Sequence, residues 1–229
     1  MVGSVTDSSP RSRLSALQRD ALREFFARER GFFLTGGAAL AGFHLGHRAT
    51  DDLDLFTTEA NAFERGRHVL RDLAANLGGS LEIRQDTPRF LRAVLQRRGE
   101  AIVIDLVHDQ AQTIATKLDR DGLRIDPAEE ILVNKITTLV SRAEERDLID
   151  VMCLERAGFR VEDALAAALE KDGGCTPAVL AWVLSEVAIP DGISLPAGIT
   201  ADELRDYLEK LIARLRRAAL PAPSAPRKT

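Results

Sequence analysis

The chain of 229 residues is 45% hydrophobic and 29% charged, which predicts a folded core and excludes an intrinsically disordered protein. Its 31 lysines and arginines against 35 aspartates and glutamates give a net charge of −4, which excludes a uniformly cationic nucleic-acid-binding protein but not a local basic groove. Cys153 and Cys175 show no CxxC spacing, so a disulfide framework and a structural zinc site are disfavoured. No apolar run approaches the length of a membrane span, and we expect a cytoplasmic protein without a membrane partner.

The first half of the chain predicts helices and strands in alternation. Residues 1–12 are rich in Ser and Thr, and we expect them to be flexible. Apolar residues recur every three to four positions between residues 12 and 30, which predicts an amphipathic helix. Further on we expect a strand at 32–35, a short helix at 38–45, a strand at 52–56, a helix at 61–77 and strands at 81–86, 90–96 and 101–107. These elements predict an antiparallel or mixed sheet with flanking helices.

The composition changes near Asp126, and the second half predicts helices alone. Asp126-Pro127-Ala128-Glu129 combines an N-cap residue, a proline at the first helical position and an acid three residues after the cap. Thr200-Ala201-Asp202-Glu203 repeats the cap and the acid three residues later. We expect helices at 127–143, 145–157, 161–171, 177–187 and 200–220. The expected domains are therefore an α/β domain at 13–125, a helical domain at 126–220 and a flexible Pro/Ala-rich tail at 221–229.

Three aspartates in the expected strands predict a metal site. Asp52 and Asp54 are two residues apart, so they lie on one face of a strand, where their carboxylates repel each other unless a cation intervenes. Asp105 is the one charged residue in the apolar run at 101–107. Three such acids can hold two Mg²⁺ ions about 3.5–4 Å apart for phosphoryl chemistry. The alternative for Asp105 is a structural acid at a strand end that binds backbone amides.

A Gly-Gly pair at residues 36 and 37 predicts a phosphate-binding turn. It stands between an expected strand and an expected helix, where glycines allow backbone N–H groups to approach a phosphate. Arg48 and Thr50 lie between this turn and the acidic pair, so the order along the chain fits a nucleotide site. A plain turn without a ligand is the alternative.

Charged residues in the helical half add further candidates. Lys135 borders an apolar stripe and either reaches a cleft or is an ordinary solvated lysine. Asp147 and Asp150 share one helix face and either serve the site or form a surface pair with Arg146. Five arginines of the strand region either line a groove for a tRNA acceptor end or cover a solvated sheet face: Arg84, Arg89, Arg92, Arg97 and Arg98.

The order of these motifs resembles that of the polymerase-β-type nucleotidyltransferases, and more narrowly of the AbiEii/AbiGii toxin family. The similarity covers about 30–155 and rests on four motifs: Gly36-Gly37-Ala38-Ala39-Leu40, Arg48-Ala49-Thr50-Asp51-Asp52-Leu53-Asp54, Lys135, and Arg146-Asp147-Leu148-Ile149-Asp150. Two features depart from the pattern. The wider superfamily usually has Gly-Ser where this chain has Gly-Gly, and Glu144 and Glu145 stand where a basic residue is expected.

The resemblance implies an α+β fold, in which a nucleotidyltransferase-type mixed sheet flanked by helices precedes an all-helical half. It implies a metal-dependent enzyme that moves NMP from an NTP to a hydroxyl and releases pyrophosphate. The expected metal is Mg²⁺, with Mn²⁺ as a substitute, and the expected partners are the NTP, a tRNA 3′ end and a cognate antitoxin. Nucleotidylation of a small molecule or a protein, and a non-catalytic binding module, are the alternatives.

The resemblance also assigns roles to individual residues. Asp52, Asp54 and Asp105 are expected to hold the metal, and Asp105 to activate the acceptor hydroxyl. The residues expected to bind the nucleotide are Gly36, Gly37, Arg48, Thr50 and Lys135. Asp150 is expected to be an essential polar residue.

Overall fold

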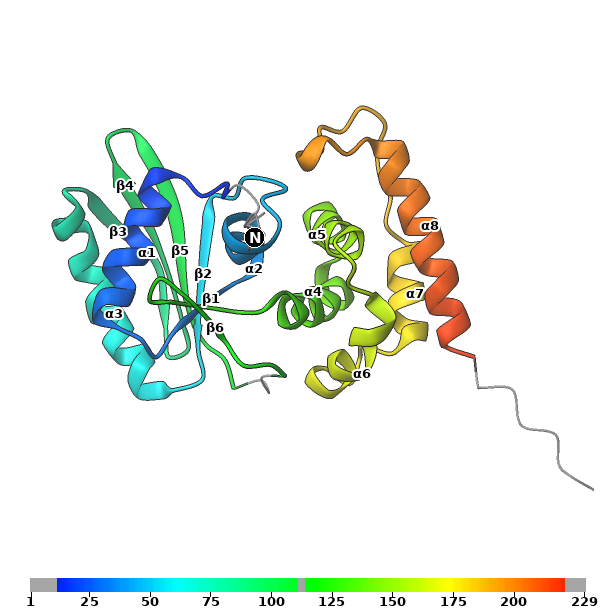
Figure 1. Cartoon of the computed structure of the whole chain (residues 1–229), viewed down its shortest axis with the longest axis horizontal. Helices are drawn as coiled ribbons and strands as arrows, with labels where there is room; N and C mark the ends of the chain where they lie inside the picture. Colours follow the sequence, from blue (N-terminus) through cyan, green and yellow to red (C-terminus); the bar gives the residue numbers. More distant parts are fainter. Residues whose placement is uncertain (1–11, 111–113, 221–229) are drawn as a thin grey trace, which may run out of the picture. The chain divides into compact units, whose positions relative to one another are not determined.

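The computed structural model describes residues 12–110 and 114–220, which divide into two compact units at 1–131 and 132–229. The first unit holds α1 (Ala16–Arg28), β1 (Phe33–Thr35), α2 (Gly36–Ala39), η1 (Leu40–His44), β2 (Asp52–Thr57), α3 (Ala60–Leu77), β3 (Ser80–Thr87), β4 (Phe90–Arg97), β5 (Glu100–His108), β6 (Leu118–Arg120) and β7 (Leu123–Ile125) (Figure 1). The second holds most of α4 (Ala128–Arg142), followed by α5 (Glu145–Arg156), α6 (Val161–Lys171), α7 (Pro177–Ser185), η2 (Pro196–Gly198) and α8 (Ala201–Ala218).

The seven strands of the first unit form one mixed sheet in the order β3-β4-β5-β2-β1-β7-β6. The pairs β2/β5 and β1/β7 are parallel, and the other neighbours are antiparallel. The expected mixed sheet followed by a helical half is confirmed. The short hairpin of β6 and β7 is absent from the sequence prediction, because three-residue strands leave almost no periodicity to detect.

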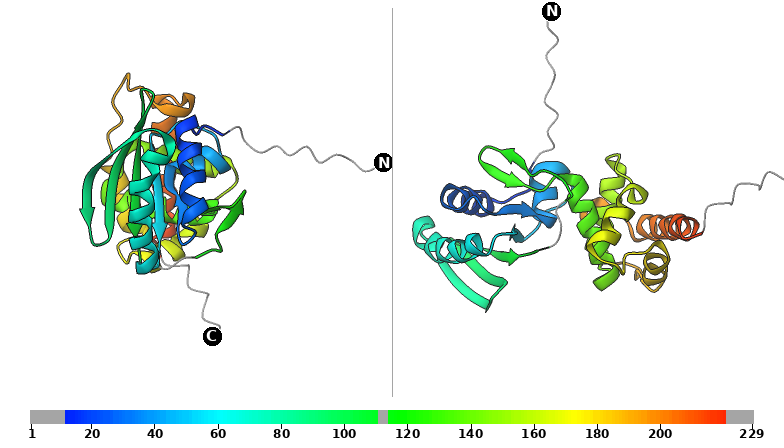
Figure 2. Two further views of the ribbon diagram at one scale, coloured as in Figure 1. Left: turned by 90° about the vertical axis from the view of Figure 1, so that its left-hand side faces the viewer. Right: turned by 90° about the horizontal axis from the view of Figure 1, so that it is seen from below.

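Helices α1 and α3 cover one face of this sheet (Figure 2). Along β2 the buried residues alternate with half-buried ones, so Leu53 and Leu55 face the helices while Asp52 and Asp54 lie on the other face. The helix side is a packed core in which Phe25 meets Phe26 and Phe32 edge to face. Burial of each such side chain stabilises the fold by about 1.5–3 kcal/mol. This core holds the sheet in place, with Asp52 and Asp54 on its opposite face.

Helix α1 begins later than predicted, at a capping box. The Ser15 hydroxyl accepts from the Gln18 backbone N–H at 3.1 Å, and the Gln18 side chain accepts from the Ser15 N–H at 2.8 Å. The Gly-Gly segment also differs from the predicted turn: helix α2 begins at Gly36 itself, directly after β1, and continues into the π-helical turn η1.

The second unit consists of helices, as predicted. Thr200 and Glu203 form the expected capping box of α8, whose buried face carries a leucine every three to four residues: Leu204, Leu208, Leu211 and Leu215. Helix α7 packs against this helix. In the part of the chain that the structure describes, no helix combines the length and apolarity that crossing a membrane requires.

Candidate active site

A row of polar side chains runs across four adjacent strands of the sheet. Thr35 of β1 pairs in register with Asp54 of β2, Asp54 with Asp105 of β5, and Asp105 with Arg92 of β4. Registered neighbours in a sheet point to the same face. Asp52 lies two residues before Asp54 and therefore shares this face. The structure thus brings the three predicted acids to one face of the sheet and adds Arg92, which was predicted for a tRNA groove or a solvated face and not for this row.

Asp105 forms a bidentate ion pair with Arg92. The guanidinium Nε lies 2.8 Å from Oδ1 of Asp105, and Nη2 lies 2.7 Å from Oδ2. The carboxylate is buried whereas the arginine side chain is 48% exposed. The alternative of a structural acid on backbone amides is wrong, because in the described part of the chain Asp105 accepts from this guanidinium.

The acids fit a divalent cation only in part as they stand. Asp52 and Asp54 offer two half-buried carboxylates on one strand face, a donor set that suits Mg²⁺. Both Asp105 oxygens are engaged by Arg92. Among residues 12–110 and 114–220, no group of three His, Cys, Asp or Glu side chains is arranged to hold a metal. Each Asp105 oxygen keeps one lone pair beyond the one that accepts from Arg92, and the three-acid cluster stays a prediction.

The Gly-Gly segment lies against Asp54 and against Arg48. Gly36 has φ +64°, and a Cβ there would collide with Oδ2 of Asp54. A Cβ on Gly37 would lie 2.8 Å from Nη2 of Arg48 and 3.5 Å from Oγ1 of Thr50. The four residues predicted to bind the nucleotide in this unit therefore converge beside Asp54. Asp54 crowds Gly36 and Arg48 crowds Gly37, and the binding of a phosphate by this segment stays a prediction.

Helix α1 holds the loop that carries Arg48 and Thr50. The buried Gln18 side chain donates from Nε2 to the Thr50 carbonyl at 2.8 Å, and the Thr50 hydroxyl accepts from the Asp52 N–H at 3.5 Å. Arg48 is 9% exposed and donates from Nη1 to the Ala49 carbonyl at 3.2 Å. Sequence reasoning missed Gln18, although a buried amide on an amphipathic helix indicates a polar partner.

In the second unit, Lys135, Asp147 and Asp150 form a buried ion cluster. The Lys135 Nζ lies 2.7 Å from Asp147 Oδ1 and 2.7 Å from Asp150 Oδ2, and Arg142 Nε lies 3.3 Å from Asp147 Oδ2. Burial acts to lower the pKa of the Lys135 ammonium, but the two carboxylates outweigh it and the pKa is raised. The alternative of a solvated lysine is wrong because Lys135 is buried, and the alternative of a surface pair is wrong because Asp147 and Asp150 are buried.

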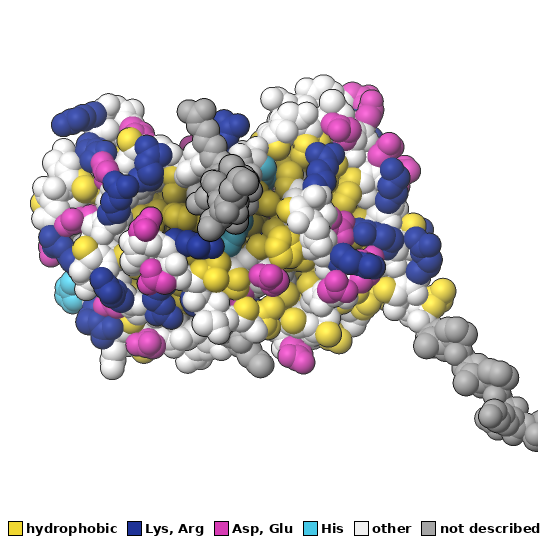
Figure 3. Space-filling model, in the orientation of Figure 1, with side chains coloured by type: hydrophobic (Ala, Val, Ile, Leu, Met, Phe, Trp, Pro, Cys, Tyr) yellow, Lys and Arg dark blue, Asp and Glu magenta, His cyan; other side chains and the backbone are white. Residues whose placement is uncertain are grey.

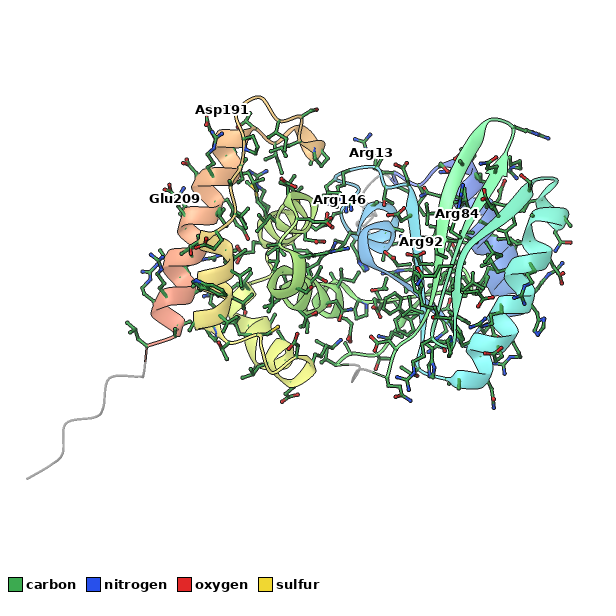
Figure 4. The ribbon with its side chains drawn as sticks, turned by 180° about the vertical axis from the view of Figure 1, so that it is seen from behind. Arg13, Arg84, Arg92, Arg146, Asp191 and Glu209 are labelled. Atoms are coloured by element: carbon green, nitrogen blue, oxygen red, sulfur yellow. The ribbon has the colours of Figure 1, made fainter. Side chains whose placement is uncertain are left out.

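Three of the five strand-region arginines are ion-paired. Arg92 meets Asp105, Arg97 meets Asp20 at 2.7 Å, and Arg84 meets Glu82 at 2.8 Å. Arg84 and Arg92 lie on the neighbouring strands β3 and β4 (Figure 4). On the face of this unit drawn in Figure 3, basic side chains are interspersed with acidic ones and form no continuous basic stripe. The groove for a tRNA end stays a prediction.

A second buried ion cluster joins the edge of the sheet to the start of α4. The Lys117 Nζ lies 2.5 Å from Asp126 Oδ1 and 3.7 Å from Glu130 Oε2. Burial raises the pKa of Asp126, against the opposing effect of Lys117. A pocket of about 440 Å³, lined among others by Phe33 and Lys117, adjoins this cluster and contains none of the predicted site residues.

Comparisons with known proteins agree with the geometry. The family described as "Nucleotidyl transferase AbiEii toxin, Type IV TA system" matches residues 19–226. No curated protein matches by sequence.

Three solved structures share the fold. A protein from Helicobacter pylori described as a candidate nucleotidyltransferase superposes with TM-score 0.53 at 19% identity, covering 89% of this chain and 98% of its own. JHP933, also from H. pylori, superposes with TM-score 0.51 at 20% identity, and the match covers 88% of this chain and 91% of JHP933. MenT4, a nucleotidyltransferase toxin of Mycobacterium tuberculosis, superposes with TM-score 0.52 at 15% identity, and the match covers 88% of this chain and 85% of MenT4. Because the family match spans most of the chain, this protein belongs to the AbiEii nucleotidyl transferase toxin family and is a nucleotidyltransferase.

Proposed function

We propose that this nucleotidyltransferase moves NMP from an NTP to an acceptor hydroxyl, with release of pyrophosphate, in a reaction that depends on Mg²⁺ or Mn²⁺. The observation that carries the proposal is the convergence of Gly36, Gly37, Arg48 and Thr50 beside Asp54. Glycine backbone, a buried guanidinium and a hydroxyl are donors suited to phosphate oxygens. They stand next to carboxylates suited to a divalent cation.

In this proposal Asp52 and Asp54 hold the cation. When bound, the metal supplies charge neutralisation for the phosphates and lowers the pKa of a bound hydroxyl. Asp105 accepts the proton of the acceptor hydroxyl, because it is the third acid of the row and stands in register with Asp54. Arg48 and the Gly-Gly backbone orient the triphosphate by hydrogen bonds.

Lys135 is proposed to bind a nucleotide phosphate, and the ion cluster supports a specific role for Asp150. An ammonium group has three donors, and two of those of Lys135 face Asp147 and Asp150. The carboxylates thereby fix the direction of the remaining donor and keep the ammonium charged. Asp150 accordingly acts by positioning Lys135, which accounts for an essential polar residue without a direct part in the chemistry.

The proposed acceptor is a tRNA 3′ end, and the proposed biological partner is a cognate antitoxin. The family description names a toxin of a type IV toxin–antitoxin system, and MenT4 is described as a nucleotidyltransferase toxin. Damage to translation through tRNA would account for toxicity. A small molecule or a protein as acceptor is the competing outcome.

Incubation with each of the four labelled NTPs, Mg²⁺ and either total RNA or lysate tests the proposal. Label in the tRNA fraction from one or more NTPs, absent with EDTA and with Asp54→Asn, is the expected result. Label in protein or in small molecules would replace the tRNA acceptor while keeping the reaction. Absence of label from every fraction, with NTP and Mg²⁺ both binding, would overturn the transfer reaction.

A further inference from the structure

A groove of about 550 Å³ lies between α5 and α8 within the second unit. The described residues that line it include four cations and one acid: Arg156, Lys210, Arg214, Arg217 and Glu155. The whole chain has a net charge of −4, so the groove reverses the charge of the molecule locally. A cleft lined by one sign of charge raises the local concentration of ligands of the opposite sign. The groove therefore favours an anionic partner.

The acid of the groove is already compensated within the fold. The Oε2 atom of Glu155 accepts from Nη2 of Arg214 at 2.6 Å and from the Tyr207 hydroxyl at 2.8 Å. Burial acts to raise the pKa of Glu155, but these hydrogen bonds outweigh it and the pKa is lowered, so the carboxylate stays charged. Arg214 Nε also lies 3.4 Å from Oε1 of Glu162. The Arg214 charge thus serves the fold, and its partner Glu155 holds Tyr207 in place.

Arg156, Lys210 and Arg217 supply the charge that is available to a ligand, and all three are exposed. Arg156 Nη2 lies 3.6 Å from Oε1 of Glu203, in a pair whose side chains are both about half exposed, and such pairs contribute little. Arg217 donates from Nε to the Ala213 carbonyl of its own helix at 3.3 Å. Lys210 and Arg217 are two helical turns apart, so their Cα atoms are separated by roughly 10 Å along one stripe of α8.

Met152 and Tyr207 give the groove an apolar side. Met152 is buried, Tyr207 is half-buried, and both line the groove. Cations that follow a phosphate backbone, together with an aromatic ring on which a base stacks, are the combination by which proteins bind single-stranded nucleic acid. A duplex keeps its bases stacked within its own helix and would leave both side chains uncovered.

We propose that the groove between α5 and α8 binds a single-stranded segment of RNA. Arg156, Lys210 and Arg217 contact its phosphates, and Tyr207 packs against a base or a ribose. The inference deepens the proposed function and rests on it, since RNA as the acceptor is what favours a nucleic acid over an acidic protein segment. The groove takes no part in the transfer of the nucleotide.

The test measures fluorescence anisotropy of a labelled oligouridylate of about 12 nucleotides, within the range that single-strand-binding proteins cover. EDTA is present and NTP is absent, so binding is separated from catalysis. The wild type should bind the single strand more tightly than a duplex RNA of the same length. Lys210→Gln combined with Arg217→Gln should lower the affinity about tenfold. The dependence of log affinity on log salt should become shallower by roughly 1.4, because each phosphate contact of a single strand contributes about 0.7.

Two further variants separate stacking and general charge from these phosphate contacts. Tyr207→Leu should weaken RNA binding about tenfold without changing the salt dependence, because stacking releases no counterions. Arg160→Gln combined with Arg216→Gln is the matched control, since both arginines are exposed cations of the same unit outside the lining of the groove. This control changes the net charge equally and should keep the affinity and salt dependence of the wild type.

Transfer reactions distinguish the inference from the proposed function. With RNA as acceptor, the variant at Lys210 and Arg217 should raise the KM for RNA about tenfold and leave kcat and the KM for NTP unchanged. Equal RNA binding by this variant and by the control overturns the inference, as does polyglutamate binding by a wild type that binds no RNA. Transfer to RNA by the wild type with unaltered binding by the groove variants defeats the inference alone. RNA binding that depends on the groove, in an enzyme that labels protein or small molecules instead, keeps the groove and refutes RNA as the acceptor.

Discussion

Asp52, Asp54 and Asp105 carry the same charge in different surroundings, so their loss should have different effects. Asparagine at any of the three should lower transfer by about 10³-fold or more, as when one member of a cooperative catalytic set is removed. In EDTA, Asp52→Asn and Asp54→Asn should leave the melting temperature unchanged or raised, because repulsion is relieved. Asp105→Asn should lower it, because the bidentate partner of Arg92 is lost.

Melting curves of the three variants in EDTA check this difference. Asp105→Asn should lower the free energy of unfolding by about 1–2 kcal/mol, a modest value because Arg92 is half exposed. This corresponds to a melting temperature lower by roughly 3–6 °C for a chain of this size. If Asp52→Asn and Asp54→Asn also melt well below the wild type, these two acids are structural hydrogen-bond acceptors and the metal site is refuted.

Gly37 tests whether Arg48 serves the nucleotide. In Gly37→Ala the new Cβ would lie 2.8 Å from Nη2 of Arg48, so the guanidinium must move. The backbone at Gly37 is not left-handed, so the fold should persist. We expect NTP affinity to fall about tenfold, since one charge-assisted hydrogen bond is worth about 1.5–3 kcal/mol, as measured by calorimetric titration. Gly173→Ala, where a Cβ meets nothing within 4 Å, is the control. Unaltered NTP binding by Gly37→Ala would remove Arg48 from the nucleotide site.

At the scale of elements, the ion cluster between α4 and α5 predicts a stability effect. Lys135→Ala leaves Asp147 and Asp150 buried without their shared cation, at a cost of about 3–5 kcal/mol. Chemical denaturation should therefore show a large loss for Lys135→Ala. Lys171→Ala in the same unit removes a hydrogen bond to Asn134 and should cost far less. Equal losses in the two variants would contradict a special role for the cluster.

The same cluster predicts a dependence on alkaline pH. The pKa of Lys135 is raised in the folded state above its ordinary value of 10.5, so the folded protein holds the proton more tightly than the unfolded chain. The contribution to stability is complete below pH 10.5 and is lost as the pH rises through the folded-state value. Denaturation of the wild type should become easier in that alkaline range, and Lys135→Ala should lack this part of the pH dependence.

At the scale of the whole molecule, NTP and metal should stabilise the protein together. The acidic row and a triphosphate repel each other without a cation, whereas ligands that bind only the folded state stabilise it by RT ln(1 + [L]/Kd), about 2.7 kcal/mol at one hundred times Kd. Thermal shift should therefore be larger with NTP plus Mg²⁺ than the sum of the separate shifts. Asp54→Asn should abolish the joint effect. Purely additive shifts in the wild type would mean that metal and nucleotide bind independently.

The register of the β4/β5 hairpin shows what the sequence could have yielded. A two-residue connection at Arg98-Gly99 pairs Arg97 with Glu100, and counting outward pairs Arg92 with Asp105. The strands and the break between them were predicted, so this partner was within reach of sequence reasoning. The burial of Lys135 could not be predicted from the sequence, because a lysine beside an apolar stripe is compatible with either exposure or burial.

The sequence alone determined the mixed sheet, the helical half, the capping box at Thr200 and the family, since periodicity, caps and motif order are local properties that survive without coordinates. Tertiary structure decided which groups meet. It paired Asp105 with an arginine, set Arg48 against Gly37, and placed Lys135 between two acids. The reason is that a contact between distant residues depends on register and packing across the fold, and a carboxylate's role depends on the charge that reaches it.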